Sequence, residues 1–67
     1  MIVYINAQPV EIFNGANLGH VVLKYSSRSY KMVCSGKLAI FDKYGFKTEA
    51  DAPVKEGQKF FMKRTNH

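Results

Sequence analysis

Few residues in this 67-residue chain could do chemistry, and the first to consider is its single cysteine, Cys34. One cysteine excludes an internal disulfide, and the other soft ligands, His20 and His67, give no spacing typical of a zinc or iron site. Cys34 follows Met32 and Val33 in an apolar run, with no general base near it in the sequence. We therefore predict a buried, unreactive thiol and no metal site.

The remaining titratable residues form no catalytic motif. His20 follows Gly19 in the predicted first turn of a helix, where the positive end of the helix dipole disfavours protonation of the imidazole. Asp42, Glu49 and Asp51 lie in or beside predicted loops, and the chain has no glycine-rich phosphate loop. We expect these four side chains to be solvated, and we expect a protein that is not an enzyme and needs no cofactor.

Length and composition indicate one small folded domain spanning residues 1–67. Hydrophobic residues make up 46% of the chain, which is too many for a disordered segment. No run approaches the ~20 consecutive apolar residues that cross a bilayer. The start, Met1 to Tyr4, has no basic stretch leading into an apolar one, as a secretory signal would. We expect a cytoplasmic protein with no membrane contact.

Hydrophobic periodicity and turn residues predict an α+β fold with one helix packed across a mixed sheet of four to five strands. Asn17 is suited to cap the helix, whose apolar stripe comprises Leu18, Val21, Val22 and Tyr25. The expected elements are strands at residues 1–5 and 9–13, the helix, a strand at 30–34, a short strand at 38–41 and a last strand at 59–63. Residues 42–45 and 48–53 are expected to form turns and irregular connections.

This order resembles the ubiquitin-like β-grasp plan, and four segments make the resemblance more specific. Residues 6–12 (NAQPVEI) resemble the strand-turn-strand "NGEPVEV" of the ThiS thiamine sulfur carriers, and residues 14–18 (NGANL) resemble their helix start, "EGATL". Residues 33–37 (VCSGK) sit where that family has a strand ending in "NG", and residues 54–60 (VKEGQKF) look like "LKDGDRV". Residues 41–53 form a longer connection than a typical carrier has.

The resemblance to the ThiS and MoaD families implies a partner and a chemistry. In those families a ThiF- or MoeB-like enzyme adenylates a C-terminal glycine carboxylate, and sulfur then replaces the AMP to give a thiocarboxylate. Only glycine lets the backbone approach the nucleotide closely, whereas Thr65, Asn66 and His67 stand here in place of Gly-Gly. The expected protein is therefore a non-catalytic or degenerate carrier domain that docks a ThiF/MoeB-like enzyme, as a separate chain or fused in a longer one.

Alternation along the strands assigns their side chains to the two faces of the sheet. The set expected to face the helix is Val3, Ile5, Val10, Ile12, Phe60 and Met62. Because the first and last strands are neighbours in a β-grasp sheet, Ile2, Tyr4 and Phe61 would form an exposed apolar patch on the other face. We predict that this patch, with Lys63 and Arg64, binds the partner. The alternative is that Tyr44 or Phe46 folds over the patch and covers it.

The net charge of +5 leaves a second kind of partner open. All ten lysines and arginines lie from Lys24 onward, and the TGS domains of RNA-associated enzymes and GTPases are also β-grasp with a similar helix start. No RNA-binding signature is present. A one-sided arrangement of the basic residues would favour RNA, whereas the apolar patch would favour a protein partner. The basic residues in question are Lys24, Arg28, Lys31, Lys59, Lys63 and Arg64.

Overall fold

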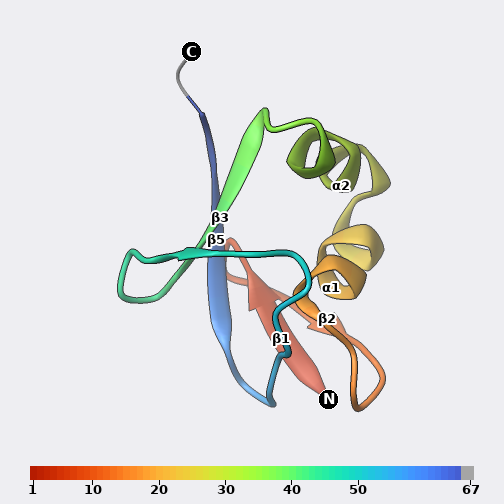
Figure 1. The fold of residues 1–67 in the computed structure, drawn as a ribbon. Helices are drawn as coiled ribbons and strands as arrows, with labels where there is room; N and C mark the ends of the chain where they lie inside the picture. Colours follow the sequence, from red (N-terminus) through yellow and green to blue (C-terminus); the bar gives the residue numbers. More distant parts are fainter. Residues whose placement is uncertain (66–67) are drawn as a thin grey trace.

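In the computed structural model, which describes residues 1–65, five strands form one mixed sheet and two helices pack on one of its faces (Figure 1). The elements are β1 (Ile2–Ile5), β2 (Gln8–Glu11), α1 (Leu18–Tyr25), α2 (Ser27–Cys34), β3 (Leu38–Asp42), β4 (Lys47–Thr48) and β5 (Lys59–Arg64). The strand order across the sheet is β2-β1-β5-β3-β4. The α+β class is as predicted, with a second helix that was not expected.

The strands predicted at residues 1–5 and 9–13 are present as β1 and β2, which pair as a hairpin whose turn has an unusual backbone. Ile5 pairs with Gln8, so Asn6 and Ala7 make a two-residue turn, with φ of 49° and 70°. Positive φ at both central residues suits the right-handed twist of a hairpin, but it is strained for alanine. The Asn6 side-chain oxygen accepts a hydrogen bond from the backbone N–H of Met62 at 3.0 Å, which ties the turn to β5.

β5 lies in the centre of the sheet. It runs parallel to β1, with Ile5 beside Phe60, and antiparallel to β3. The strands predicted at 38–41 and 59–63 are both confirmed. The pairing brings the beginning and the end of the described chain together in one sheet.

One hydrophobic core fills the space between the sheet and the helices. Val3, Ile5, Leu18, Val21 and Val22 are fully buried. Five of the six side chains expected to face the helix are buried, and the sixth, Met62, is partly buried against them. Alternation therefore assigned the inner face correctly.

α1 begins as predicted, with Asn17 as its N-cap. The Asn17 side-chain oxygen accepts from the backbone N–H of His20 at 2.9 Å, and His20 Nδ1 accepts from the Asn17 N–H at 3.1 Å. This reciprocal capping box satisfies two N–H groups that the helix itself leaves free. His20 is exposed, as expected, but it has a structural partner.

The strand predicted at residues 30–34 is wrong, because these residues belong to α2. Ser26 has an extended backbone that ends α1, and its N–H still bonds to the carbonyl of Val22. Its hydroxyl then accepts from the N–H of Ser29 at 3.2 Å and caps α2. Tyr30 and Val33, three residues apart, pack against the core from one side of this helix.

Candidate functional site

The face of the sheet that the helices leave open carries aromatic side chains from three adjacent strands. Phe41 of β3 and Phe61 of β5 are directly opposite each other in the antiparallel register. Tyr4 of β1 lines the same hollow as Phe61. Phe61 is 39% exposed, while Tyr4 and Phe41 are half-buried. These three rings form a continuous surface, which we call the open face.

Lysines border these rings. Lys59 and Lys63 lie two residues before and after Phe61 on β5, so strand alternation places them on the same face. The Lys63 ammonium lies 6.0 Å from the centre of the Phe41 ring. Lys47 of β4 pairs with Phe41 on the far side. The open face is therefore apolar at its centre and positive around it.

The open face is hollowed on both sides of Phe61. One hollow, of about 390 Å³, is lined by Tyr4, Ala7, Lys59 and Phe61. The other, of about 540 Å³, is lined by Asn6, Phe41, Asp42, Lys43, Gly45, Phe61, Met62 and Lys63. Phe61 forms the ridge between them, so a partner that fills both hollows encloses this ring.

Only some of the residues predicted to bind a partner lie together around the two hollows of the open face. Tyr4, Phe61 and Lys63 lie on the open face with the two hollows. Ile2 follows the alternation of Tyr4 along β1 and so lies on the same face, but it lines neither hollow. Arg64 follows the alternation of Phe60 and therefore lies on the opposite face of β5.

Phe41 is not among the residues that the sequence predicts for this surface. The alternation within residues 38–42 is the signal that could have found it, since Ile40 is buried and Phe41 therefore points the other way. The position of Lys59 on the open face could have been predicted in the same way, because Lys59 precedes Phe60, which faces the core.

The loop aromatics do not cover the open face. Tyr44 and Phe46 are 72% and 70% exposed, so neither ring is packed on the sheet. They lie in the β3–β4 loop, which projects to the side of the sheet away from the helices (Figure 1, green to teal). The rings add exposed aromatic surface beside the open face.

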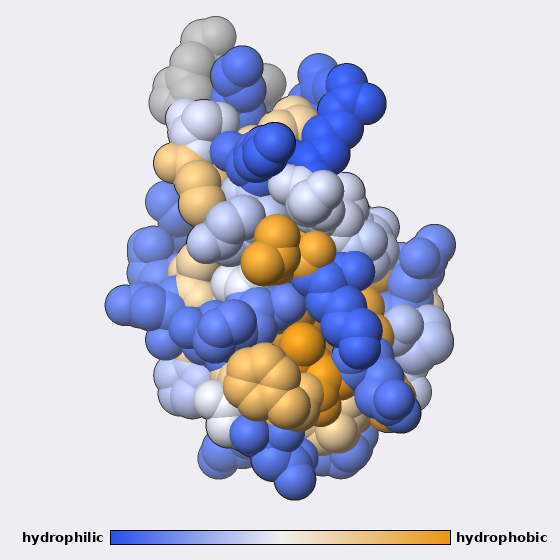
Figure 2. All heavy atoms as spheres, turned by 90° about the vertical axis from the view of Figure 1, so that its right-hand side faces the viewer, coloured by the Kyte–Doolittle hydropathy of each residue, from blue (hydrophilic) through white to orange (hydrophobic). Residues whose placement is uncertain are grey.

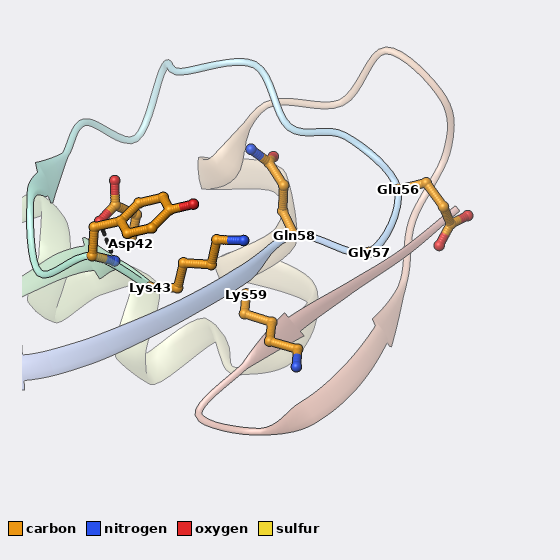
Figure 3. A pocket seen from close by; sticks show the side chains of 7 residues that line it. Asp42, Lys43, Glu56, Gly57, Gln58 and Lys59 are labelled. Atoms are coloured by element: carbon orange, nitrogen blue, oxygen red, sulfur yellow. Dashed lines mark hydrogen bonds between the residues drawn. The ribbon is translucent and has the colours of Figure 1, made fainter.

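A third hollow separates this loop from the turn that precedes β5. Its lining residues are Asp42, Lys43, Tyr44, Glu56, Gly57, Gln58 and Lys59 (Figure 3). The Lys43 side chain extends toward the turn that carries Gln58, while Glu56 lies at the far end of that turn. Glu56 accepts a hydrogen bond from the N–H of Ile2 at 2.9 Å, which fixes this turn against β1.

The basic residues are not gathered on one side. Lys24 lies on α1, and Arg28 and Lys31 lie on α2, all exposed on the helix layer. Figure 2, which looks onto that layer, shows hydrophobic areas separated by hydrophilic side chains. The helix side also carries the exposed residues Phe13 and Leu23. The one-sided arrangement that would have favoured RNA is absent among the described residues.

The prediction of a buried Cys34 is wrong, because its side chain is exposed at the end of α2. Tyr30 lies one helical turn earlier. Hydrogen bonding to Cys34, then the negative charge of the thiolate, and lastly partial desolvation raise the pKa of the Tyr30 phenol above its ordinary value. The protonated phenol is thus favoured in the folded state. This contribution to stability is present below the ordinary pKa of tyrosine and is lost as the pH rises through the raised value.

Replacing Cys34 with alanine is expected to lower the pKa of Tyr30 toward its ordinary value of 10.0, because it removes both the hydrogen bond and the thiolate. An NMR titration of the Tyr30 ring would measure the change, with Met32→Ala on the same helix as the matched control. An unchanged Tyr30 titration in the Cys34 variant would show that the two side chains do not interact.

The carboxylates of Asp42, Glu49 and Asp51 are either bonded to backbone or exposed. Asp42 accepts hydrogen bonds from the backbone of its own loop, and Glu49 and Asp51 are exposed. Within residues 1–65, no three histidine, cysteine, aspartate or glutamate side chains are grouped so that they could hold a metal ion. Asp42 therefore has a structural role that the sequence did not predict.

Thr65 is held in place beyond the end of β5. Its N–H donates to the carbonyl of Lys37 at 3.1 Å, and its hydroxyl donates to the carbonyl of Gly36 at 2.7 Å. These two bonds tie Thr65 to the turn before β3. The other two predicted tail residues, Asn66 and His67, lie outside the described part of the chain.

Over residues 1–65, neither helix is long and apolar enough to span a membrane. The chain matches no protein-family model, no curated protein and no solved structure.

Proposed function

We propose that this chain is a ThiS-like β-grasp domain that docks a ThiF/MoeB-like adenylating enzyme through the open face of its sheet. It would work as a binding domain in sulfur-carrier or thiamine metabolism, without chemistry of its own. The strand order β2-β1-β5-β3-β4, with a parallel central pair and helices on one face, is compatible with the β-grasp plan. The second helix is a departure from the single helix expected.

Two of the four segments that carry the sequence resemblance, residues 6–12 and 14–18, lie at the hairpin turn and at the start of α1, as the resemblance implies, whereas residues 33–37, likened to the end of a strand, lie at the end of α2. Asn6 and Ala7 make the first turn, and Gly15 has a φ of 89°, a conformation that glycine adopts readily. Ala16 is buried and Asn17 caps α1. These features support a common fold and thereby the proposed class of partner.

The observation that carries the proposal is the open face itself. Its centre is aromatic and hollowed, and its border carries Lys47, Lys59 and Lys63. Aromatic residues surrounded by polar ones are typical of protein–protein contacts. An adenylating enzyme with an apolar patch and carboxylates around it would complement this surface.

The test is a titration of ¹⁵N-labelled protein with purified ThiF- and MoeB-like enzymes from the genome that encodes this chain. We expect chemical-shift changes on the open faces of β1, β5 and β3, and we expect Phe61→Ala to weaken binding at least about tenfold, since central aromatic anchors dominate interface energies. The matched control is Phe13→Ala, because Phe13 lies on the helix side and its ring is 58% exposed.

Absence of binding to every such enzyme would refute the proposal, as would shift changes confined to α1 and α2. The same titration with single-stranded RNA tests the alternative that the chain is a TGS-like domain that binds RNA. Binding of RNA with stronger shifts than any enzyme produces would favour that alternative, in which bases stack on the exposed rings.

A further inference from the structure

We infer that the β3–β4 hairpin tip, residues 42–47, determines which partner is bound, by inserting two aromatic rings into an apolar recess with an acidic rim on the docked protein. This inference rests on the proposed function and adds a second contact to it. The tip comprises the last residue of β3, the loop between β3 and β4, and the first residue of β4.

The tip is locked in one shape. Asp42 Oδ1 accepts hydrogen bonds from the N–H groups of Tyr44 and Phe46, at 2.9 and 3.0 Å. The Asp42 N–H donates to the carbonyl of Phe46, and the Gly45 N–H donates to the carbonyl of Asp42. Gly45 has a φ of 86°, which closes the loop without a steric penalty. A loop that is already ordered loses less entropy on binding.

The same hydrogen bonds determine what the tip presents to a partner. The carboxylate of Asp42 is directed at its own backbone, whereas Tyr44 and Phe46 are largely exposed. The Lys43 ammonium lies 5.1 Å from the centre of the Tyr44 ring, and Lys47 directly follows Phe46. The tip therefore offers two rings, with a positive charge over the Tyr44 ring and a second lysine next to Phe46 in the sequence. Its complement is an apolar recess bordered by carboxylates.

The tip and the open face are parts of one surface. Asp42, Lys43 and Gly45 of the tip line the same 540 Å³ hollow as Phe41, Phe61 and Lys63. On its other side, the tip borders the hollow shown in Figure 3, which reaches Lys59. A protein that covers Phe61 and fills these hollows therefore contacts the tip as well.

The exposed rings of the tip and the distribution of the basic residues favour a protein as the partner over a nucleic acid. Two exposed rings on a rigid loop resemble the aromatic anchors of protein interfaces, which supply much contact area at a low entropic cost. The basic residues divide between the two layers and do not follow one continuous track that a nucleic-acid backbone would need.

The experiment compares three variants for binding to the enzyme that shows the strongest shifts, by calorimetry. Tyr44→Ala/Phe46→Ala removes both rings, and we expect it to weaken binding at least about tenfold. Lys43→Gln/Lys47→Gln keeps the rings and is expected to weaken binding several-fold and to reduce its dependence on salt. Phe13→Ala/Leu23→Ala removes two exposed apolar side chains from the helix side and is expected to bind like the wild type.

A fourth variant tests whether the locked shape matters. Asp42→Ala keeps both rings and removes the acceptor of two backbone N–H groups. We expect faster amide hydrogen exchange at Tyr44 and Phe46 and a several-fold weaker affinity.

The outcomes separate this inference from the proposed function. Wild-type affinity in Tyr44→Ala/Phe46→Ala, together with impaired binding in Phe61→Ala, would overturn the role of the tip and leave docking through the open face intact. Failure of the wild-type chain to bind any of the enzymes would overturn both. Circular dichroism would check that each variant is folded, and the exposure of Tyr44 and Phe46 leads us to expect a folded Tyr44→Ala/Phe46→Ala variant.

Discussion

Replacing Phe60 with alanine is expected to unfold a large fraction of the protein. Phe60 is 4% exposed and packs in the core beside β1. Truncation of a buried phenylalanine costs about 3–5 kcal/mol, because it removes apolar contacts and leaves a cavity. A domain of this length has a total stability of roughly 3–10 kcal/mol. Urea denaturation followed by circular dichroism would measure the loss.

The neighbouring residue provides the control. Phe61 follows Phe60 on β5 but lies on the open face, 39% exposed. Phe61→Ala is expected to lower the free energy of unfolding much less, by about 1 kcal/mol, while it removes the proposed anchor for docking. Equal destabilisation by the two substitutions would contradict the assignment of these side chains to opposite faces.

The second large effect is expected for Leu18→Ala at the start of α1. Leu18 is fully buried, and its N–H donates to the carbonyl of Ala52 at 2.9 Å. It therefore joins the helix to the core at the point where the connection before β5 crosses the helix start. We expect a loss of about 2–5 kcal/mol in the free energy of unfolding.

Leu23→Ala on the same helix is the matched control, because Leu23 is 46% exposed. Its replacement is expected to change stability by less than about 1 kcal/mol in urea denaturation. A Leu23 variant as unstable as the Leu18 variant would mean that α1 buries a different side from the one described.

The parts of the fold that could be predicted are those in which local signals agree with tertiary packing. The turn at Asn6, the cap at Asn17 and the alternation around Phe60 each identify an element from neighbouring residues alone. Each of these elements also buries its apolar residues in the observed structure. The structure of such segments can be predicted from the sequence because local preference and global packing agree.

α2 could not be predicted by the same means, because local preference and packing disagree there. Tyr30 and Val33 are residue types enriched in strands, but they follow Ser26, which caps a helix. The packing of Tyr30 and Val33 against the core decides the conformation. The wrong strand prediction also led to the wrong prediction for Cys34, which is exposed on the last turn of α2 and is not buried in a strand.

The candidate site was predicted in part for a similar reason. Tyr4 and Phe61 follow from alternation within single strands. The pairing of Phe61 with Phe41 depends on the strand order, and the shape of the tip depends on how Asp42 turns back on its own loop. Neither is encoded in the spacing of residues along one strand.

The central position of β5 has a consequence for how the chain is made. A ribosome releases β1, β2, both helices, β3 and β4 before β5, yet β5 is the strand that joins β1 to β3. Until then β1 and β3 each lack the strand that pairs with them in the finished sheet, and the helices have no complete sheet to cover. Folding of the domain therefore waits until Arg64 has left the ribosome, and during that interval the unpaired edges are open to association with other chains.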